Sequence, residues 1–424
     1  MEVTSRRSRL NGSVDIPGSK SHTIRAVIIG ALANGESVIE APLDSLDTLS
    51  ALNAVQTLGA EVESSSQHWI IRGTGGAPRK PDDIIDVGNS GTTLYMIMGT
   101  ASLVAGQTVL TGDDQIRRRT AQPLIDALSG LGVDIFSTRD NGCAPIVVQG
   151  KMKGGTTSVE GISSQYLSSL LMSCPLADSA SMIDVPLLNE RPYVHMTLDW
   201  LKRTGIKVDA ADDLSRIRID GGQRFDSFTR RIPGDFSSAT FMICAGVLTG
   251  GSVVVSGLEP DDPQGDKAVI DILREMGAEI TVEPDVIIVH GSSLRGIEID
   301  MNAIPDALPM LSVCACFAEG ITVLRNVEQA RMKETDRIAV MASELKTLGA
   351  DVSERPDGLE IKGGGLRGGR VHGHGDHRIV MAMTVAGMAA DGGITVDTAE
   401  SADITFPGFW EKMTQLGAKI EIVR

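Results

Sequence analysis

The 424-residue sequence is poor in aromatic residues and in positive charge, and both shortages exclude classes of function. Aromatic residues make up only 3%, so the stacking surfaces that bind single-stranded nucleic acids are not expected. Lysine and arginine total 39 against 55 for aspartate and glutamate, and the net charge of −16 argues against a nucleic-acid partner. An anionic ligand would therefore need cations that are gathered locally.

Cysteines and long apolar runs are scarce as well. The longest apolar run, around residues 307–318, is shorter than the ~18 residues of a membrane span, and the N-terminal segment lacks the apolar core of a signal peptide. The cysteines form no CxxC pair, which favours a reducing compartment and argues against structural zinc. They are Cys143, Cys174, Cys244, Cys314 and Cys316. We therefore expect a cytoplasmic protein without a membrane partner.

A repeated phrase organises the chain. It reads LGAEV, LGVDI, TGIKV, MGAEI, LGADV and LGAKI, and its glycines are Gly59, Gly132, Gly205, Gly277, Gly349 and Gly417. The gaps between them are 73, 73, 72, 72 and 68 residues, so six copies of one unit fill the chain. In each copy an amphipathic helix is predicted to end at the glycine, and a β-branched strand follows.

A second helix in each copy begins with a polar cluster and is then nearly apolar all round. Such a helix is predicted to be buried, with the sheets outside it, and the whole unit reads β-α-β-α-β-β. The six openings are Lys20-Ser21, Asn89-Ser90-Gly91-Thr92, Ser163-Ser164-Gln165, Asp235-Phe236-Ser237-Ser238, Pro305-Asp306 and Asp376-His377-Arg378.

These openings are also candidate anion sites, because helix N-termini carry unpaired N–H groups and partial positive charge. Ser, Asn and Asp there are ordinary N-caps too, so only the recurrence, with cations nearby, indicates a function. The cations are Lys20, Arg25, Arg119, Arg191, Lys333, Arg337 and Arg378. They predict a substrate with two or three negative groups.

Six motifs carry a resemblance to a known family. They are Gly18-Ser19-Lys20-Ser21 with Arg25, GNSGTT at 88–93, Ser163-Ser164-Gln165, Ile304-Pro305-Asp306-Ala307, Lys333-Glu334-Thr335-Asp336-Arg337 and Gly375-Asp376-His377-Arg378. In this order, over essentially the whole chain, they resemble the 5-enolpyruvylshikimate-3-phosphate synthases. The related UDP-N-acetylglucosamine enolpyruvyl transferases share the repeat but lack the combination of GSKS, KETDR and GDHR.

The resemblance implies an inside-out α/β barrel fold with two pseudo-threefold domains. Residues 16–233 would form the first domain and residues 1–15 with 234–424 the second, with the active site in the cleft between them. The implied reaction transfers the enolpyruvyl group of phosphoenolpyruvate to the 5-hydroxyl of shikimate 3-phosphate. It implies no metal and no organic cofactor, and we expect a monomer that is sensitive to glyphosate.

The resemblance also implies roles for particular residues. Asp306 would accept the hydroxyl proton, and Lys20 and Glu334 are alternatives for the proton at the methylene. The implied shikimate 3-phosphate contacts are Lys20, Ser21, Arg25, Ser163, Ser164, Gln165, Arg191, Asp306 and Lys333. The implied phosphoenolpyruvate contacts are Lys20, Asn89, Gly91, Arg119, Gln165, Arg337, His377 and Arg378.

Four positions depart from the family pattern. Ile24 stands where Asn is common, and Ile404 replaces a frequent Lys. Tyr95 stands where Arg is usual, and Glu190 where Ser or Thr is usual. If a phosphate binds beside Glu190, its carboxylate should turn away or pair with a cation, because like charges repel.

Other functions remain open from the sequence. The acceptor could be a UDP-sugar, and the chain could be a metabolite-binding paralogue without activity. The repeat also resembles that of RNA 3′-terminal phosphate cyclases, although charge and composition disfavour RNA. The HxHxxH run formed by His372, His374 and His377 suggests a metal, but its Gly-rich setting without a nearby carboxylate pair argues against one.

Overall fold

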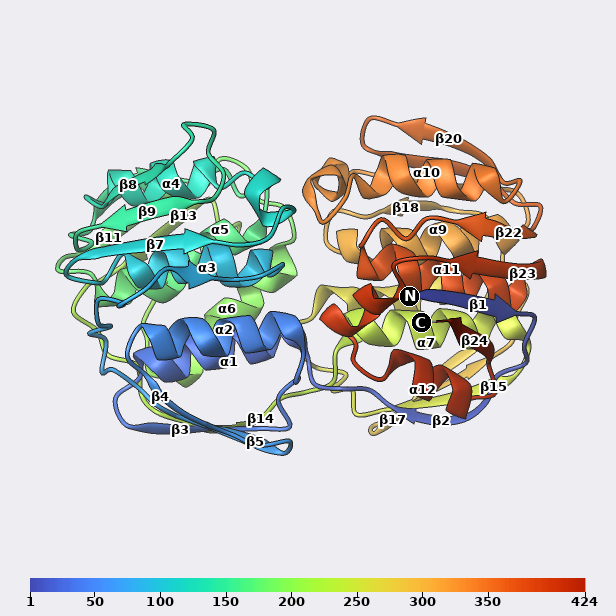
Figure 1. Cartoon of the computed structure of the whole chain (residues 1–424), viewed down its shortest axis with the longest axis horizontal. Helices are drawn as coiled ribbons and strands as arrows, with labels where there is room; N and C mark the ends of the chain where they lie inside the picture. Colours follow the sequence, from blue (N-terminus) through green and yellow to red (C-terminus); the bar gives the residue numbers. More distant parts are fainter. Residues whose placement is uncertain (424) are drawn as a thin grey trace. The chain divides into compact units, whose positions relative to one another are not determined.

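The computed structural model describes residues 1–423 and divides the chain into two compact units. Unit 1 comprises Met1–Pro17 and Pro233–Arg424, and unit 2 comprises Gly18–Ile232. In the colours of Figure 1, unit 2 runs from blue to green, and unit 1 combines the dark-blue N-terminus with the yellow to red part of the chain. Each unit has its own hydrophobic core.

Unit 2 contains three sheets and six α-helices. The strands are β3 (Glu36–Glu40), β4 (Glu61–Ser64), β5 (His68–Arg72), β6 (Ile85–Asp86), β7 (Gln107–Thr111), β8 (Asp134–Ser137), β9 (Ile146–Gln149), β10 (Gly155–Ser158), β11 (Ser181–Asp184), β12 (Asp209–Ala210), β13 (Arg216–Ile219) and β14 (Thr229–Arg231). The helices are α1 (Lys20–Leu32), α2 (Leu46–Thr57), α3 (Gly91–Ala101), α4 (Gln122–Gly130), α5 (Ser164–Ser173) and α6 (Arg191–Arg203), with short 3₁₀ turns η1 (Ile116–Arg118) and η2 (Cys174–Leu176).

Unit 1 has the same kind of content over its described residues. The strands are β1 (Glu2–Arg6), β2 (Asn11–Asp15), β15 (Ser252–Ser256), β16 (Ile280–Val282), β17 (Val286–His290), β18 (Glu298–Asp300), β19 (Ile321–Arg325), β20 (Asp351–Arg355), β21 (Gly358–Lys362), β22 (Arg367–Val371), β23 (Asp391–Val396) and β24 (Lys419–Val423). The helices are α7 (Phe236–Thr249), α8 (Ala268–Glu275), α9 (Leu308–Phe317), α10 (Arg337–Thr347), α11 (His377–Ala389) and α12 (Phe409–Gln415). The 3₁₀ turns are η3 (Gly265–Lys267), η4 (Pro305–Ala307), η5 (Glu328–Met332) and η6 (Ala399–Ile404).

The sheets share one topology, and within residues 1–423 there are six of them, each four-stranded. In the sheet β10-β11-β13-β12, the first two strands are parallel and the other pairs antiparallel. Thr157 faces Ile183 across the parallel pair, and Ile183 faces Ile217 across the antiparallel one. One helix joins the first two strands, and another precedes the last two. The predicted β-α-β-α-β-β unit is thereby confirmed.

Three sheets take a strand from a distant part of the chain. β14, just before α7, pairs in parallel with β3 and supplies the first strand of the sheet around α1. β2, just before α1, pairs in parallel with β15 and does the same for the sheet around α7. β1 lies between β23 and β24 and completes the last sheet. The repeats are therefore not all contiguous in sequence.

Six helices form the centres of the two units, as the sequence predicts. In unit 2 these central helices are α1, α3 and α5, and in unit 1 they are α7, α9 and α11. Nearly every residue of each is buried, and all 11 residues of α3 are. Within each unit of Figure 1 the strands surround these helices. Helices without a polar face are stable only when covered on all sides.

The other six helices end as the repeated phrase predicts. Each is followed by a glycine with positive φ, for example 98° at Gly59 and 106° at Gly277. Left-handed backbone costs a glycine little, so a glycine there ends a helix and redirects the chain. On α2, Leu52, Val55 and the following Leu58 are buried and Leu49 is half-buried, as an amphipathic helix requires.

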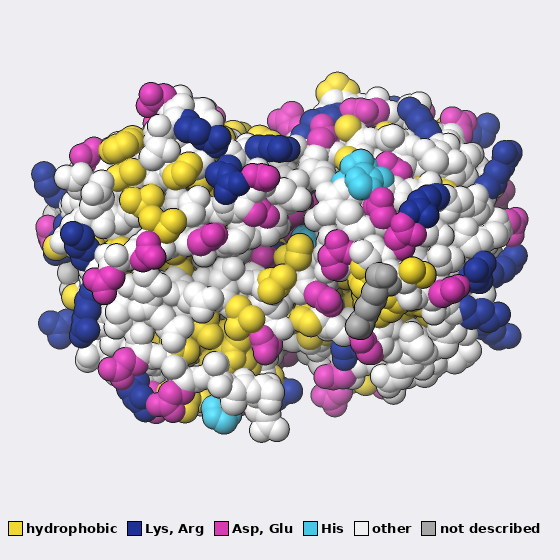
Figure 2. All heavy atoms as spheres, viewed as in Figure 1, with side chains coloured by type: hydrophobic (Ala, Val, Ile, Leu, Met, Phe, Trp, Pro, Cys, Tyr) yellow, Lys and Arg dark blue, Asp and Glu magenta, His cyan; other side chains and the backbone are white. Residues whose placement is uncertain are grey.

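The surface that Figure 2 shows carries Lys and Arg interspersed with Asp and Glu. All five cysteines are free and buried, with Cys314 and Cys316 in the core of unit 1 as expected. Among residues 1–423, no helix combines the length and the apolar character that crossing a membrane requires.

Candidate functional site

Arg25 is the buried cation of unit 2. It lies on α1 with 1% of its surface exposed, and its guanidinium donates hydrogen bonds to Thr197 Oγ1 at 2.8 Å and Ser21 O at 2.9 Å. Further bonds reach Tyr193 O at 3.1 Å and Ser168 Oγ at 3.3 Å. All four acceptors are neutral. Burial lowers the pKa of Arg25 to about 10, against a smaller opposing effect of Tyr193 and Glu190.

Ser168, which accepts a hydrogen bond from Arg25, lies on α5. The N-terminus of this helix holds three of the predicted residues. Ser163 is the N-cap, and its hydroxyl accepts a hydrogen bond from Gln165 N at 3.4 Å. Ser164 donates from Oγ at 2.7 Å and from N at 3.3 Å to Oε2 of Glu190. Glu190 is 3% exposed, and these two hydrogen bonds hold its carboxylate at this helix end. The helix end attracts it because unpaired N–H groups favour a negative charge.

Lys20 and Ser21 begin α1 and are half-buried. The Lys20 ammonium lies 3.1 Å from Oδ2 of Asp47, a buried residue in the first turn of α2. Asp47 was not among the predicted residues, because it precedes the repeated phrase and has no motif of its own. Its acidic position in a first helical turn was the available signal.

Arg119 and Gly91 approach each other closely. A Cβ atom placed on Gly91 would lie 2.6 Å from Nη1 of Arg119. Gly91 therefore leaves room for the Arg119 guanidinium. Asn89 donates to Asp113 at 2.6 Å and to Gln115 at 3.0 Å, so its amide is held by its own loop.

Tyr95, one of the departures, is part of an aromatic pair near Arg119. Its ring lies 4.9 Å from the ring of Tyr166 at 87°, an edge-to-face arrangement. Both hydroxyls donate to the carbonyl of Thr120, at 3.1 and 2.7 Å. The two tyrosines thus fix the residue that follows Arg119.

Arg191 differs from the other predicted cations of unit 2 because it is exposed at the start of α6. It lies near Asp213: the Ser215 hydroxyl and amide are the main causes of the lowered pKa of that carboxyl, and Arg191 contributes a smaller part. Ile24 is buried in the core and Ile404 half-buried at the end of η6.

Arg337 is the centre of a charged cluster in unit 1. Its side chain is 1% exposed, and it donates to Asp376 from Nε at 2.9 Å and from Nη2 at 3.1 Å. It also donates to Asp306 at 2.8 Å and to Glu334 at 2.5 Å. Burial alone would lower the pKa of Arg337, but Asp376, Glu334 and Asp306 raise it above its usual value.

Asp306 lies among three cations. Its carboxylate is 3.1 Å from Arg378, 2.8 Å from Arg337 and 3.7 Å from Lys333. Burial would raise the pKa of Asp306, but Arg378, Lys333 and Arg337 outweigh it and hold the pKa well below its usual range. The residue comes from η4, directly before the central helix α9. Asp306 thus belongs to a cluster of three acidic and three basic groups, in which Glu334 and Asp376 are joined to it through Arg337.

Asp376 organises this cluster, although no role beyond the opening of its helix was predicted for it. It is fully buried and is the N-cap of α11, where it accepts the Arg378 N–H at 2.9 Å. It also accepts the Thr335 hydroxyl at 3.0 Å. His377, the first residue of α11, is 1% exposed and close enough to affect the pKa of Asp376. An Asp followed by two basic residues was the signal that could have identified it.

Two histidines and a cysteine that the sequence brought into question, His372, His374 and Cys143, have partners outside these clusters. His372 contacts Asp397 at 2.6 Å and His374 contacts Glu344 at 2.8 Å. Within residues 1–423, no group of three His, Cys, Asp or Glu side chains is arranged to hold a metal ion. Cys143 is buried, its backbone pairs with Thr120, and burial raises the pKa of its thiol.

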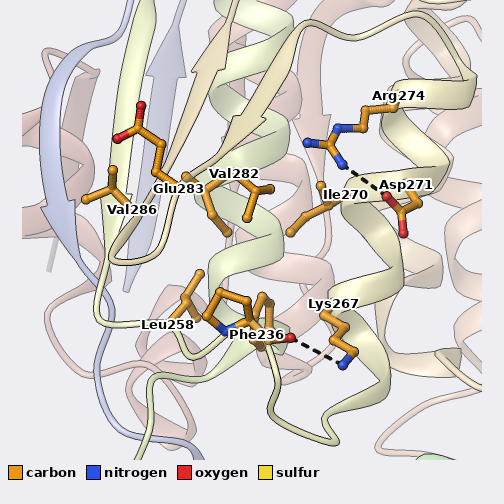
Figure 3. Close-up of a pocket in the computed structure, with 11 residues that line it drawn as sticks. Phe236, Leu258, Lys267, Ile270, Asp271, Arg274, Val282, Glu283 and Val286 are labelled. Carbon is orange, nitrogen blue, oxygen red and sulfur yellow. Dashed lines mark hydrogen bonds and ion pairs between the residues drawn. The ribbon is translucent and has the colours of Figure 1, made fainter.

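A cavity of about 230 Å³ in unit 1 lies apart from the predicted residues (Figure 3). It is bounded by α8 and the β16–β17 hairpin, and Phe236, Ile270 and Val282 line it. Its Arg274 donates to Ile280 O and to Asp271, so this cation is held by its own surroundings. Phe236 belongs to one of the six predicted helix openings, but none of the residues with an implied substrate contact lines the cavity.

Comparisons with known proteins all point to one family. The family model for EPSP synthase (3-phosphoshikimate 1-carboxyvinyltransferase) matches residues 4–413. The 3-phosphoshikimate 1-carboxyvinyltransferase of Ruminiclostridium cellulolyticum is 48% identical over 98% of this chain and 99% of its own length. That of Acetivibrio thermocellus is 49% identical over 98% of both chains. An EPSP synthase structure from Acinetobacter baumannii superimposes with a TM-score of 0.85, at 29% identity and over the full length of both.

The matches cover the whole repeat, and the likeness in structure confirms the predicted fold class. By family pattern, by sequence and by fold, this chain belongs to the EPSP synthase (3-phosphoshikimate 1-carboxyvinyltransferase) family of transferases.

Proposed function

We propose that the residues gathered on the two units carry out the reaction for which the relatives are named, with shikimate 3-phosphate as acceptor. The chain is a 3-phosphoshikimate 1-carboxyvinyltransferase of aromatic amino acid biosynthesis: it transfers the enolpyruvyl group of phosphoenolpyruvate to the 5-hydroxyl of shikimate 3-phosphate and releases phosphate. The assignment of individual residues, the monomeric state and the cytoplasmic location are predictions.

The observation that carries the residue assignment is the position of Asp306 among Arg337, Arg378 and Lys333. Both substrates are anions, and these cations suit a carboxylate and a phosphate. An anion that binds Arg378 or Lys333 competes with Asp306 for their charge. The pKa of Asp306 then rises from its low value towards a range in which it accepts the hydroxyl proton.

The predicted site residues of unit 2 offer neutral hydrogen-bond donors and form fewer close ion pairs than those of unit 1. In this proposal Ser163, Ser164 and Gln165 at the start of α5 bind the acceptor, with Arg25 and Ser21 behind them. Arg119 contacts phosphoenolpyruvate in the space that Gly91 leaves. Lys20 and Glu334 remain alternatives for the proton at the methylene.

The proposal is tested by phosphate release from phosphoenolpyruvate with shikimate 3-phosphate, with UDP-N-acetylglucosamine in parallel. Asp306→Asn and Glu334→Gln remove the titratable group and keep its shape, and turnover should fall ~100-fold or more in each. Asp351→Asn, an exposed carboxylate on β20, is the matched control and should leave turnover unchanged. If phosphate is released only with the UDP-sugar, the acceptor is a UDP-sugar and not shikimate 3-phosphate. If no phosphate is released with either compound, the chain binds metabolites without catalysing the transfer.

The melting temperature should also fall in Asp306→Asn. Asp306 neutralises Arg337 and Arg378, both buried, so its charge supports the fold as well as the reaction. The kinetics are therefore compared well below the melting temperature of the variant.

A further inference from the structure

Glu190 combines a rare backbone conformation with a buried charge. Its φ of 54° and ψ of 40° lie in the left-handed region, which is uncommon for a residue with a Cβ and persists only where contacts hold it. The preceding Asn189 ties the loop to the start of α5, because its N donates to Gly161 O at 2.9 Å and its Nδ2 to Ile162 O at 3.2 Å. The Glu190 side chain is therefore aimed at α5 by a fixed loop.

At that helix end the carboxylate takes the place of a bound anion. Ser164 gives it both a hydroxyl and a backbone donor, while the cap Ser163 accepts the next amide. The end of a helix with unpaired N–H groups binds anions. Here the anion is part of the chain.

Arg25 provides an independent reason for a negative group at this place. It is buried, its hydrogen-bond acceptors are neutral, and burial lowers its pKa, against which Glu190 acts in the opposite direction. Glu190 thus supplies part of the counter-charge of Arg25. A phosphate at the same donors would supply that charge itself, and would repel the carboxylate.

We propose that Glu190 is an internal competitor for the phosphate of the acceptor: it occupies the Ser164 donors in the unliganded protein and leaves them when the phosphate binds. This inference rests on the proposed function, which binds that phosphate at Ser163 and Ser164. Glu190 thereby supplies part of the counter-charge of Arg25 in the unliganded protein and weakens the affinity for shikimate 3-phosphate. It determines specificity through charge and takes no part in the chemistry.

The test is calorimetry on Glu190→Gln and Glu190→Ser, with shikimate 3-phosphate and with shikimate as the two probes. Both variants should bind shikimate 3-phosphate at least tenfold more tightly than the wild type, or ~1.4 kcal/mol. Their affinity for shikimate, which lacks the phosphate, should not change. The KM for shikimate 3-phosphate should fall without a change in the KM for phosphoenolpyruvate. Glu160→Gln removes the same charge from an exposed position of unit 2 and should alter neither affinity.

Equal or weaker binding of shikimate 3-phosphate by both variants would overturn the inference, as would an equal gain for shikimate, which indicates repacking. If Glu190→Ser does not fold, Glu190→Gln decides, because it keeps the length of the side chain. Failure of the proposed function looks different: the wild type then neither binds shikimate 3-phosphate nor releases phosphate with it, and both ideas fall. Normal turnover by the wild type with no tighter variant removes only the role of Glu190.

Discussion

Arg25 in unit 2 and Arg337 in unit 1 are equally buried, with 1% exposed, yet their pKa values move in opposite directions. The acceptors of Arg25 are hydroxyls and carbonyls, so burial dominates and its pKa falls to about 10. Arg337 is bonded to three carboxylates, which overcome burial and raise its pKa. The local partners, rather than depth, decide how well a buried charge is compensated.

The difference assigns different work to the two arginines. Arg337 is already neutralised by its own unit, and its two bonds to Asp376 fix it in place. It therefore holds Asp306 and Glu334 in position. Arg25 lacks such a carboxylate among its hydrogen-bond acceptors, so it retains attraction for an anion from outside.

The largest expected effect on stability comes from removing a carboxylate that contacts Arg337. Asp376→Asn removes the negative charge of a buried partner of Arg337 and should lower the free energy of unfolding by about 3–5 kcal/mol. Thr197→Val is the matched change at Arg25 and removes one neutral partner, at a cost of about 1.5–3 kcal/mol. Urea denaturation followed by circular dichroism measures both. Equal losses would mean that hydroxyls hold a buried guanidinium as firmly as carboxylates.

The next effect is a dependence on acid. The pKa values of Asp306 and Asp376 are lowered in the folded protein: burial opposes this, but the neighbouring arginines prevail. Because an unfolded Asp titrates near ~3.9, their stabilisation is complete above about pH 4 and is lost as the pH falls through the lower folded values. The melting temperature of the protein should therefore decrease when the pH is lowered below about 4.

The two variants sharpen this test. The difference in melting temperature between the wild type and Asp376→Asn should shrink as the pH falls, because the wild type then loses the same charge. The difference between the wild type and Thr197→Val should stay constant, since no titrating carboxylate is removed. Parallel curves for all three proteins would contradict a special role of the carboxylates.

The smallest effect is expected at Gly91. Gly91→Ala places a Cβ 2.6 Å from the Arg119 guanidinium, which has to move. We expect the KM for phosphoenolpyruvate to rise by less than about tenfold, under ~1.4 kcal/mol, and glyphosate inhibition to weaken more. Steady-state kinetics with and without glyphosate measure both.

A double variant separates the two readings of this glycine. If Gly91 acts through Arg119, adding Gly91→Ala to Arg119→Ala should change little further. Additive effects would instead mean that the new methyl group contacts the ligand directly.

Local patterns in the sequence predict the repeat and its helices well. The positive φ at Gly59 and the buried Leu52 and Val55 follow from spacing alone, because helix ends and apolar faces depend on neighbours in sequence. The start of α5 within the polar cluster Ser163-Ser164-Gln165 was predicted for the same reason. Contacts between distant residues were not available in this way.

Asp376 and Asp47 illustrate what was missed. Each lies in a position where an acidic residue is common as a cap or in a first turn, so Asp376 received no role beyond its motif and Asp47 was not singled out. Their partners, Arg337 and Lys20, are 39 and 27 residues away in the chain. The turn of Glu190 towards Ser164 likewise depends on a loop conformation that no local pattern encodes.

The six-fold repeat, the buried central helices and the family can be predicted from the chain, because each rests on periodicity or on residues close together in sequence. The pairing of β1, β2 and β14 with distant strands becomes visible only after folding, since strand pairing is a choice between distant segments. The tertiary structure also sets the pKa values of Arg25 and Arg337. These pKa values depend on which groups share a buried volume, and burial is created only when the chain folds.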